Sequence, residues 1–338
     1  MRVLIVKTSS LGDVIHTLPA LTDAGCIYPD IRFDWVIEEN FSEIPAWHPL
    51  VDKIIPMAWR RWRKNLFQLK TYREMKRFYQ QLRSQSYDYV IDAQGLVKSG
   101  IITRFTRGLR CGLDRQSAWE PIANLAYQRH CAVNPDQHAV TRMRQLFAAA
   151  LGYPAPDSAA DYNIHIEAAS DKKSIVFLHG TTWTTKLWPD EYWIQLAQLA
   201  VKQNYKIVLP WGNVVEKQRA EHIASVVSSP LITVLPPLNL ANIGQVLMQA
   251  AAIVAVDTGL GHLAAAFEIP TISLYGPTSA RLTGTEGTNQ YHLQADFPAC
   301  APCLQRQCTY TGLAAAQPAC LGSLTPEKVW NQLQGLLS

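Results

Sequence analysis

Two segments near the end of the chain combine residue types that bind anions. An apolar run at 251–256 is followed by Asp257, Thr258 and Gly259, and a helix of small residues then begins with His262 in its first turn. This order brings backbone N–H groups, a hydroxyl and an imidazole to the carboxyl end of a strand, where α/β sheets bind anionic ligands. A second strand, 271–275, ends in Gly-Pro-Thr and repeats the pattern. The segments predict phosphate binding.

Two further strand ends carry polar residues of the same kind. The strand at 174–179 leads into a loop with four threonines, among them Thr181 and Thr182, and with Lys186. Hydroxyls, free N–H groups and an ammonium suit a pyrophosphate, although an ordinary βα loop also favours Thr and Lys. Glu216 follows the strand at 206–210, where its carboxylate could accept hydrogen bonds from a ribose diol. An acid in the first turn of a helix is the plain alternative.

Asp13 stands at the corresponding place near the start of the chain. The strand at 2–7 ends in a small polar loop, and Gly12-Asp13 then opens a helix. An acid at this position often only caps the helix and complements its dipole. The functional alternative is a general base exposed at the strand end. The loop lacks the Gly-x-x-x-x-Gly-Lys pattern of a Walker phosphate loop.

A strongly basic stretch follows at 60–83, with nine Lys or Arg residues and one acid, Glu74. A solvated basic helix is the simplest interpretation. Trp59 and Trp62 alternate with cations, however, and this composition suits the headgroup level of a membrane. Arginine forks also bind carboxylates and phosphates in bidentate fashion. An acidic acceptor at an anionic membrane surface would account for both properties.

Four of the seven cysteines form the pattern C-x2-C-x4-C-x11-C in a proline-rich segment, and they are Cys300, Cys303, Cys308 and Cys320. Four thiolates could close a structural zinc site. A disulfide and free thiols are the alternatives, and no catalytic role is expected here. Gly259, Gly261 and Ala264 also fit the dinucleotide fingerprint formally, but this match is weak because no acid follows the next strand.

The remaining chain shows how these loops are positioned. Strand-like and helix-like runs alternate, which is typical of parallel sheets. Expected strands include 32–37, 53–56 and 89–92, and expected helices include 68–84, 136–151 and 325–337. A Pro- and Ala-rich linker at about 153–173 separates two domains, 1–165 and 166–338. No run is long enough to span a bilayer, the first residues read as a strand of a cytoplasmic protein, and a net charge of +4 does not suggest nucleic acid.

Taken together, the chain resembles glycosyltransferase family 9, the ADP-heptose:lipopolysaccharide heptosyltransferases, and it is most similar to the type I members. The similar segments run over nearly the whole chain, at 7–20, 60–64, 92–99, 138–140, 181–186, 209–212 and 257–262. The resemblance implies a GT-B fold with two Rossmann-like domains facing a central cleft. It places the acceptor on the first domain and the nucleotide sugar on the second, and it implies a last helix that returns to the first domain.

The resemblance also implies roles for single residues. The enzyme would move L-glycero-D-manno-heptose from ADP-heptose to Kdo of lipid A with inversion, in the lipopolysaccharide inner core. Asp13 would be the catalytic base, and Lys186 would stabilise the departing ADP. The implied donor-binding residues are Thr181, Thr182, Lys186, Glu216, Asp257, Thr258, Gly259 and His262. The implied acceptor-binding residues are Ser10, Gly12, Arg60, Arg61, Arg63, Lys64, Gln94, Lys98 and His138.

Several alternatives stay open. The chain has no Asp-x-Asp pair, so neither a metal nor another cofactor is expected in catalysis. The cysteine pattern is typical of type II members, and Trp119 stands where type I members tend to have Arg. A type II enzyme, or a variant that acts on phosphorylated Kdo, is therefore an alternative. A protein of another class, a non-catalytic anion- or zinc-binding protein at the membrane face, is a further one. The expected enzyme contacts the cytoplasmic face of the inner membrane peripherally.

Overall fold

A computed structural model of the chain describes residues 1–166, 174–314 and 316–337. The chain folds into two compact units, Met1–His165 and Ile166–Ser338. Part of the expected linker, residues 167–173, lies outside the described residues. No helix in the described ranges has both the length and the apolar character needed to cross a bilayer.

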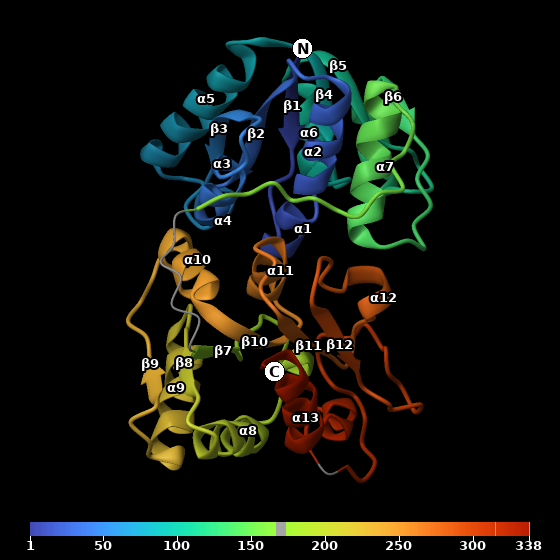
Figure 1. Ribbon diagram of the computed structural model, residues 1–338. Helices are drawn as coiled ribbons and strands as arrows, with labels where there is room; N and C mark the ends of the chain where they lie inside the picture. The colour runs from blue at the N-terminus through green and yellow to red at the C-terminus, as the bar shows by residue number, and fades with distance from the viewer. Residues whose placement is uncertain (167–173, 315, 338) are drawn as a thin grey trace. The chain divides into compact units, whose positions relative to one another are not determined.

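The first unit is built on a six-stranded parallel sheet with the strand order β3-β2-β1-β4-β5-β6 (Figure 1). Its strands are β1 (Arg2–Val6), β2 (Arg32–Glu38), β3 (Val51–Met57), β4 (Ser86–Asp92), β5 (Arg107–Leu113) and β6 (Arg129–Cys131). Its helices are α1 (Leu11–Ile15), α2 (Leu18–Ile27), α3 (Glu43–Ala46), α4 (Trp59–Trp62), α5 (Leu69–Arg83), α6 (Val97–Arg104) and α7 (Ala139–Leu151).

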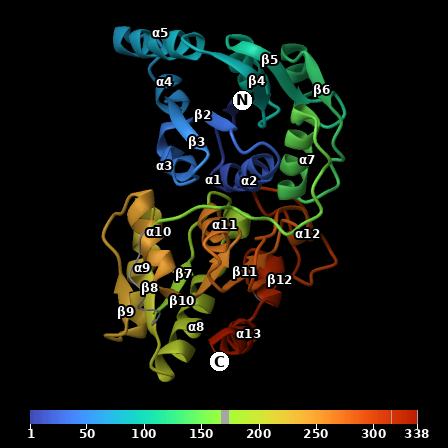
Figure 2. The same ribbon diagram turned by 45° about the horizontal axis from the view of Figure 1, so that its top comes forward.

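Helices cover both faces of this sheet because alternate strand residues point to opposite sides. Leu4 packs with Phe78 of α5 and Ile102 of α6 in one buried cluster. On the other face, the ring of Phe33 lies 6.3 Å from that of Phe147 of α7, and α7 packs along α2. In Figures 1 and 2, α5 lies toward the β3 edge and α7 toward the β6 edge. A sheet covered on both faces needs strands with continuous apolar runs, such as residues 3–6 of β1, which are all buried.

The second unit repeats this plan with the strand order β12-β11-β10-β7-β8-β9. Its strands are β7 (Ser174–Leu178), β8 (Lys206–Leu209), β9 (Ile232–Val234), β10 (Ala250–Val256), β11 (Thr271–Tyr275) and β12 (Gln290–Gln294). Its helices are α8 (Asp190–Lys202), α9 (Val214–Val227), α10 (Leu240–Met248), α11 (Gly259–Ala266), α12 (Ala280–Thr283) and α13 (Pro326–Leu337). The expected α/β architecture of two Rossmann-like parallel sheets is confirmed.

The last helix differs from its expected position. Val329 and Leu333 of α13 are fully buried in the same apolar cluster as Ile175 of β7 and Trp193 of α8. The helix packs against α8, β10 and β11, which all belong to the second unit. The expected return to the first domain is therefore wrong for α13, because its apolar face is covered within its own unit.

Three strands escaped the sequence analysis, namely β5, β6 and β12. Only the last three residues of β5 are buried, and Arg107 and Arg110 interrupt its apolar pattern. β6 and β12 lie at the edges of their sheets, and none of the five residues of β12 is buried. Edge strands need no apolar run, so the pattern that identifies the inner strands is missing from them.

The four cysteines do not form a metal site. All seven cysteines are free thiols, and Cys300 and Cys308 are exposed whereas Cys320 is buried. Among the residues that the structure describes, no group of three or more His, Cys, Asp or Glu side chains could hold a metal ion. The structure therefore gives no support to the zinc alternative or to the disulfide among the residues that it describes. Burial, with a smaller contribution from the neighbouring thiols, raises the pKa of Cys320 to about 11, which keeps this thiol protonated at neutral pH.

The buried His48 makes the stability of the first unit depend on pH. Its Nδ1 accepts a hydrogen bond from the Leu50 N–H at 3.2 Å, and its Nε2 lies 3.1 Å from the Thr22 hydroxyl. Burial lowers the pKa of His48 to about 4. The folded-state pKa thus lies below the unfolded value of about 6.5, so the neutral ring contributes stability above that pH. This contribution is lost as the pH falls from about 6.5 toward 4.

We expect the free energy of unfolding of the first unit to fall by about 2 kcal/mol between about pH 7.5 and pH 5 through His48 alone. Hydrogen exchange of the β1 and β2 amides in urea measures this quantity. His48→Gln cannot take up the proton and should reduce the pH dependence by that amount. Identical pH dependence in the variant and the parent would contradict the assignment.

Candidate functional site

In each unit, the strand order reverses at one place in the sheet. The chain runs outward from β7 to β8 and β9, then crosses back to β10, so the loops that follow β7 and β10 leave in opposite directions. The same reversal occurs between β1 and β4 in the first unit. Ligands of open α/β sheets bind at the carboxyl ends of the strands at such a switch point. The predicted site residues Asp13, Lys186 and Asp257 follow three of these four strands.

A buried ion pair joins the two loops of the second unit. The Lys186 ammonium lies 2.7 Å from Oδ2 of Asp257, and the two side chains are 15% and 8% exposed. Thr278 donates a hydrogen bond of 2.6 Å to the same oxygen, and the Thr181 hydroxyl donates to the Asp257 carbonyl at 3.2 Å. The ammonium also lies 4.5 Å from the centre of the Trp183 ring. Asp257 therefore fixes Lys186, whose other N–H donors can still bind an anion.

The helix α11 begins directly beside this pair. Thr258 is its N-cap residue in extended conformation, and Gly259 is its first helical residue. First-turn amides of a helix have no acceptor within the helix and favour negative charge. His262 lies in the same turn, is 6% exposed, and places Nε2 4.0 Å from Oδ1 of Asp257. Thr182 is exposed on the neighbouring loop. The structure thus brings together most of the predicted donor residues.

Glu216 lies between the ends of β7 and β8. Its Oε2 accepts a hydrogen bond of 2.7 Å from the Gly212 N–H, and its own N–H donates to Asn213, the N-cap of α9. A Cβ atom on Gly180 would lie 2.5 Å from its carboxyl carbon. Glu216 is therefore a first-turn acid, as the plain alternative held, and it also presents a carboxylate at the strand ends. The sequence analysis did not name Gly180 or Thr278 as site residues, although it noted the Gly-Pro-Thr motif that contains Thr278.

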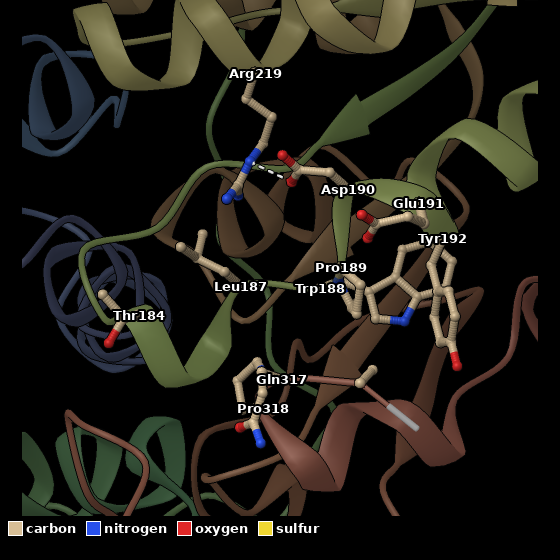
Figure 3. Close-up of a pocket in the computed structure, with 11 residues that line it drawn as sticks. Thr184, Leu187, Trp188, Pro189, Asp190, Glu191, Tyr192, Arg219, Gln317 and Pro318 are labelled. Atoms are coloured by element: carbon tan, nitrogen blue, oxygen red, sulfur yellow. Dashed lines mark ion pairs between the residues drawn. The ribbon is translucent and has the colours of Figure 1, made fainter. Parts of the chain in front are cut away.

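A cavity of about 590 Å³ lies next to these loops, between the start of α8 and residues Gln317 and Pro318 (Figure 3). Asp190 and Glu191 line it, and Arg219 is already paired with Asp190 at 2.8 Å. Two carboxylates with one neutralised cation would repel a diphosphate. No residue predicted to bind the donor lines this cavity, and the predicted donor residues lie at the carboxyl ends of the strands instead.

In the first unit, Gln94 joins the loops that follow β1 and β4. Its Oε1 accepts hydrogen bonds from the Thr8 and Ser9 N–H groups at 3.0 and 3.1 Å, and the side chain is buried. Lys7 lies under the same loop, fully inside the protein, and donates from Nζ to the Ala93 carbonyl at 2.9 Å. Burial lowers the pKa of Lys7, and the negative charges of Asp13 and Asp92 counteract part of this effect. Gln94 is thus a structural bridge at the place where an acceptor contact was predicted.

Asp13 uses one carboxylate oxygen to hold the helix that carries it. Its Oδ2 accepts hydrogen bonds from the N–H and the hydroxyl of Ser10, at 2.8 and 2.6 Å. Its Oδ1 forms no hydrogen bond within the described parts of the chain, and the side chain is half-buried. Gly12 is buried in the same short helix, α1. The capping alternative is correct for one oxygen, and the other oxygen is open to act as a base.

The basic stretch divides into paired and unpaired cations. Arg61 forms ion pairs with Glu39 at 3.1 Å and Glu74 at 2.7 Å, so its fork is occupied. Arg60 lies 5.0 Å above the Phe41 ring. The exposed Arg63 and Lys64 side chains make no ion pair with any residue in the described ranges.

Two other predicted contacts have different surroundings. Lys98 is half-buried, and burial lowers its pKa, an effect that the nearby positive charges of Arg60 and Arg63 increase. His138 is the N-cap of α7 and accepts a hydrogen bond from the Val140 N–H. Its ring packs edge-on against His16, with centroids 6.0 Å apart. Because His16 directly follows α1, this contact brings His138 to the side of the sheet that carries Asp13.

The sequence analysis interpreted the tryptophans of this stretch as suited to the headgroup level of a membrane. In the structure they pack against the first unit instead. Trp62 is 4% exposed, packs 5.7 Å from the Phe78 ring and donates from Nε1 to Glu74 at 2.8 Å. Trp59 packs against the same cluster. Trp62 is buried because it attaches α4 to α5, whereas Trp59 is partly buried. The exposed apolar side chains are their neighbours Leu66 and Phe67.

The fold therefore consists of two parallel α/β units, one with a fixed ammonium beside a helix N-terminus and one with an open carboxylate. The chain belongs to glycosyltransferase family 9 (heptosyltransferase), whose family model matches residues 75–314. It is a glycosyltransferase.

Relatives support this over the full length. The chain is 52% identical to "Lipopolysaccharide heptosyltransferase 1" of Pseudomonas aeruginosa, over 100% of this chain and 98% of that protein. It matches the structure "E. coli heptosyltransferase WaaC with ADP" with a TM-score of 0.88 and 42% identity, over 99% and 100% of the two chains. The structure of WaaC "with ADP-2-deoxy-2-fluoro heptose" gives a TM-score of 0.85 at 42% identity, over 99% of both. The expected GT-B fold is confirmed.

The ion pair between Lys186 and Asp257 should contribute strongly to the stability of the second unit. Asp257→Ala leaves a buried ammonium without its partner, so we expect a loss of about 3 kcal/mol in the free energy of unfolding. Thr278→Val removes one hydrogen bond to the same oxygen but keeps the pair, and should cost only about 1 kcal/mol. Urea unfolding of both variants measures the difference. Equal costs would show that the pairing does not stabilise the unit.

Proposed function

We propose that this enzyme transfers L-glycero-D-manno-heptose from ADP-heptose to a Kdo sugar of lipid A, in the biosynthesis of the lipopolysaccharide inner core. The observation that carries the proposal is the Lys186 ammonium, held by Asp257 beside the N-terminus of α11. This arrangement suits a diphosphate leaving group. Identity of 52% along the whole chain to a protein named heptosyltransferase 1 supports the sugar and the acceptor.

Release of ADP from the donor depends on stabilising the negative charge of the diphosphate. As the bond between C1 of the heptose and the diphosphate oxygen breaks, negative charge grows on ADP. Lys186, the hydroxyls of Thr181 and Thr182 and the amides at Thr258 and Gly259 would bind that charge. Two neighbouring acids have other tasks. Glu216 would accept hydrogen bonds from the adenosine ribose, and Asp257, with His262, positions the donor through Lys186.

The acceptor half rests on Asp13. Its unpaired Oδ1 would take the proton from a Kdo hydroxyl while the hydroxyl oxygen attacks C1 from the side opposite ADP, which inverts the anomeric configuration. Ser10 holds the other oxygen and so fixes the direction of the carboxylate. Arg60, Arg63, Lys64 and Lys98 supply positive charge for the lipid A phosphates. The chemistry needs no metal or organic cofactor.

The protein would work at the cytoplasmic face of the inner membrane, bound peripherally. An apolar edge formed by Leu66, Phe67, Leu69 and Tyr72 is exposed between α4 and the first turn of α5, and Phe67 is fully exposed. The exposed cations of α5 continue the same surface, and they are Lys70, Arg73, Lys76, Arg77 and Arg83. Apolar groups next to clustered cations suit a surface of anionic lipid.

The type I reaction is favoured over the alternatives. The high identity is to a type 1 enzyme along the entire chain, although the cysteines resemble type II members. The non-catalytic alternative is not favoured because the chain belongs to a family of glycosyltransferases.

Replacing Asp13 tests the reaction directly. A general base typically contributes about 10²–10⁴-fold in rate. We therefore expect Asp13→Asn, which keeps the size of the side chain, to lower turnover at least about 100-fold without changing ADP affinity. The assay follows ADP release and the mass of the product from ADP-heptose and Kdo-lipid A.

The parent enzyme should add one heptose to the Kdo sugar. Transfer only to phosphorylated Kdo, or only to an acceptor that already carries heptose, would reject the type I reaction. Near-normal turnover by Asp13→Asn would remove Asp13 from the mechanism while leaving the transfer itself intact. Ser10→Ala serves as a control, because it loosens the carboxylate and should lower turnover far less.

Vesicle binding tests the apolar edge. We expect Phe67→Ser combined with Leu69→Ser to weaken binding to phosphatidylglycerol vesicles at least about tenfold, since two large apolar side chains no longer enter the lipid. Leu313→Ser in the second unit is a matched control, because Leu313 is also fully exposed. Sedimentation with the vesicles measures the bound fraction. Equal effects of the two changes would place the contact elsewhere.

A further inference from the structure

Arg142 is a buried arginine that pairs with no carboxylate among the residues that the structure describes. It lies in the first turn of α7, and its side chain is 7% exposed. One guanidinium nitrogen, Nη2, donates to the Ser117 carbonyl at 3.0 Å, and the group lies 5.4 Å from the centre of the Trp119 ring. Its Nε is buried and forms no hydrogen bond with any residue that the structure describes. Part of the fork is therefore unused.

Arg144 shows what a satisfied arginine looks like on the same helix. It is also 7% exposed. Its Nε and Nη2 donate to the two carboxylate oxygens of Asp23 at 2.6 and 2.9 Å, and Nη1 donates to the Ser158 carbonyl. A buried guanidinium normally needs such an anion, because burial without one costs several kcal/mol. Arg142 has the same burial and lacks the anion.

Arg142 shares the charge of Asp13 with a second buried cation, Lys7. Burial is the largest influence on Arg142 and lowers its pKa, and the negative charge of Asp13 counteracts this. Lys7, a second buried cation, also lies close enough for the charge of Arg142 to lower its pKa. Asp92 also acts on Lys7, and its Oδ1 already accepts hydrogen bonds from the Gln94 and Gly95 N–H groups. Asp13 is the acid whose negative charge acts on both buried cations.

Arg142 belongs to the same site as the base. Its backbone N–H donates to the His138 carbonyl, one turn earlier. The ring of His138 packs against His16, three residues after Asp13. Trp119, which covers the guanidinium, is itself 72% exposed. A ligand can therefore reach the unused donors by displacing one surface indole.

We propose that Arg142 binds the carboxylate of an acidic acceptor sugar and thereby selects acceptors that carry this group. The free Nε–H would be one donor of a bidentate contact, a geometry that arginine favours with carboxylates. Binding there supplies the missing anion and places the sugar beside the open oxygen of Asp13. The inference rests on the proposed function, since it takes Kdo, an acidic sugar, as the acceptor. It moves recognition of the carboxylate from the exposed arginines at 60–63 to a buried one.

The test compares two acceptors: Kdo-lipid A and the same molecule with the Kdo carboxylate reduced to an alcohol. We expect the parent enzyme to lose at least about 100-fold in kcat/KM on the reduced acceptor, as charged hydrogen bonds of this kind imply. Arg142→Met should be weak on Kdo-lipid A and should lose little more on the reduced acceptor. Its ADP affinity should equal that of the parent. Arg142→Lys, which keeps the charge without the fork, should discriminate to an intermediate degree and serves if the Met variant does not fold.

The discrimination ratio separates recognition from a structural role. A merely structural Arg142 would lower activity on both acceptors by the same factor and leave the ratio at the parent value, and this result would overturn the inference. A parent enzyme that uses both acceptors equally would overturn it too, while leaving the heptose transfer standing. A parent enzyme that transfers to neither would instead reject the proposed function.

Discussion

Both units depend on one polar side chain that ties together the loops at the reversal of strand order. In the second unit this residue is Asp257, which binds Lys186 and Thr278 through its side chain and Thr181 through its carbonyl. In the first unit it is Gln94, whose Oε1 accepts from the N–H groups of Thr8 and Ser9. The two loops that leave the reversal in opposite directions form a crevice between them. Without a side chain that joins them, these loops would collapse into the crevice or move away from it. Each tie fixes the geometry in which neighbouring groups can bind a ligand.

Asp13 shows how a structural role and the proposed chemical role can coexist in one side chain. A carboxylate has two oxygens, and the helix cap with Ser10 uses only Oδ2. The hydrogen bonds of the cap hold the carboxylate in one orientation, and they therefore also fix the direction of the remaining oxygen. Glu216 follows the same logic, since one oxygen binds the Gly212 N–H and the other remains at the strand ends. In both cases the capping and the functional interpretation of the sequence describe different atoms of the same residue.

The sequence predicted the inner strands and the loops that follow them, because these segments combine an apolar run with glycine, threonine and a charged residue. β10, α11 and the loop with Lys186 are examples. It failed where a residue's role depends on a distant partner. Arg61 was predicted to bind the acceptor, but it is paired with Glu39 and Glu74. Trp62 was interpreted as a residue that contacts the membrane, but it packs on Phe78.

The sequence did not single out Arg142, and it misplaced α13, for related reasons. Arg142 resembles any other helix arginine in the sequence, and only the structure shows that it is buried with an Nε that bonds to none of the described residues. The family resemblance suggested that the last helix returns to the first domain, whereas in this chain Val329 and Leu333 of α13 are buried within the second unit. Local pattern determines whether a segment is a helix, but only tertiary packing determines which surface covers it.

Amide hydrogen exchange with each ligand alone tests most directly whether the two strand-order reversals bind the two substrates. The account predicts that ADP slows exchange at 180–186 and 257–261 in the second unit, and that Kdo-lipid A slows exchange at 8–13 and 138–142 in the first. Protection by ADP confined to the cavity segments at 188–192 and 316–318, or to the loops of the first unit, would contradict it.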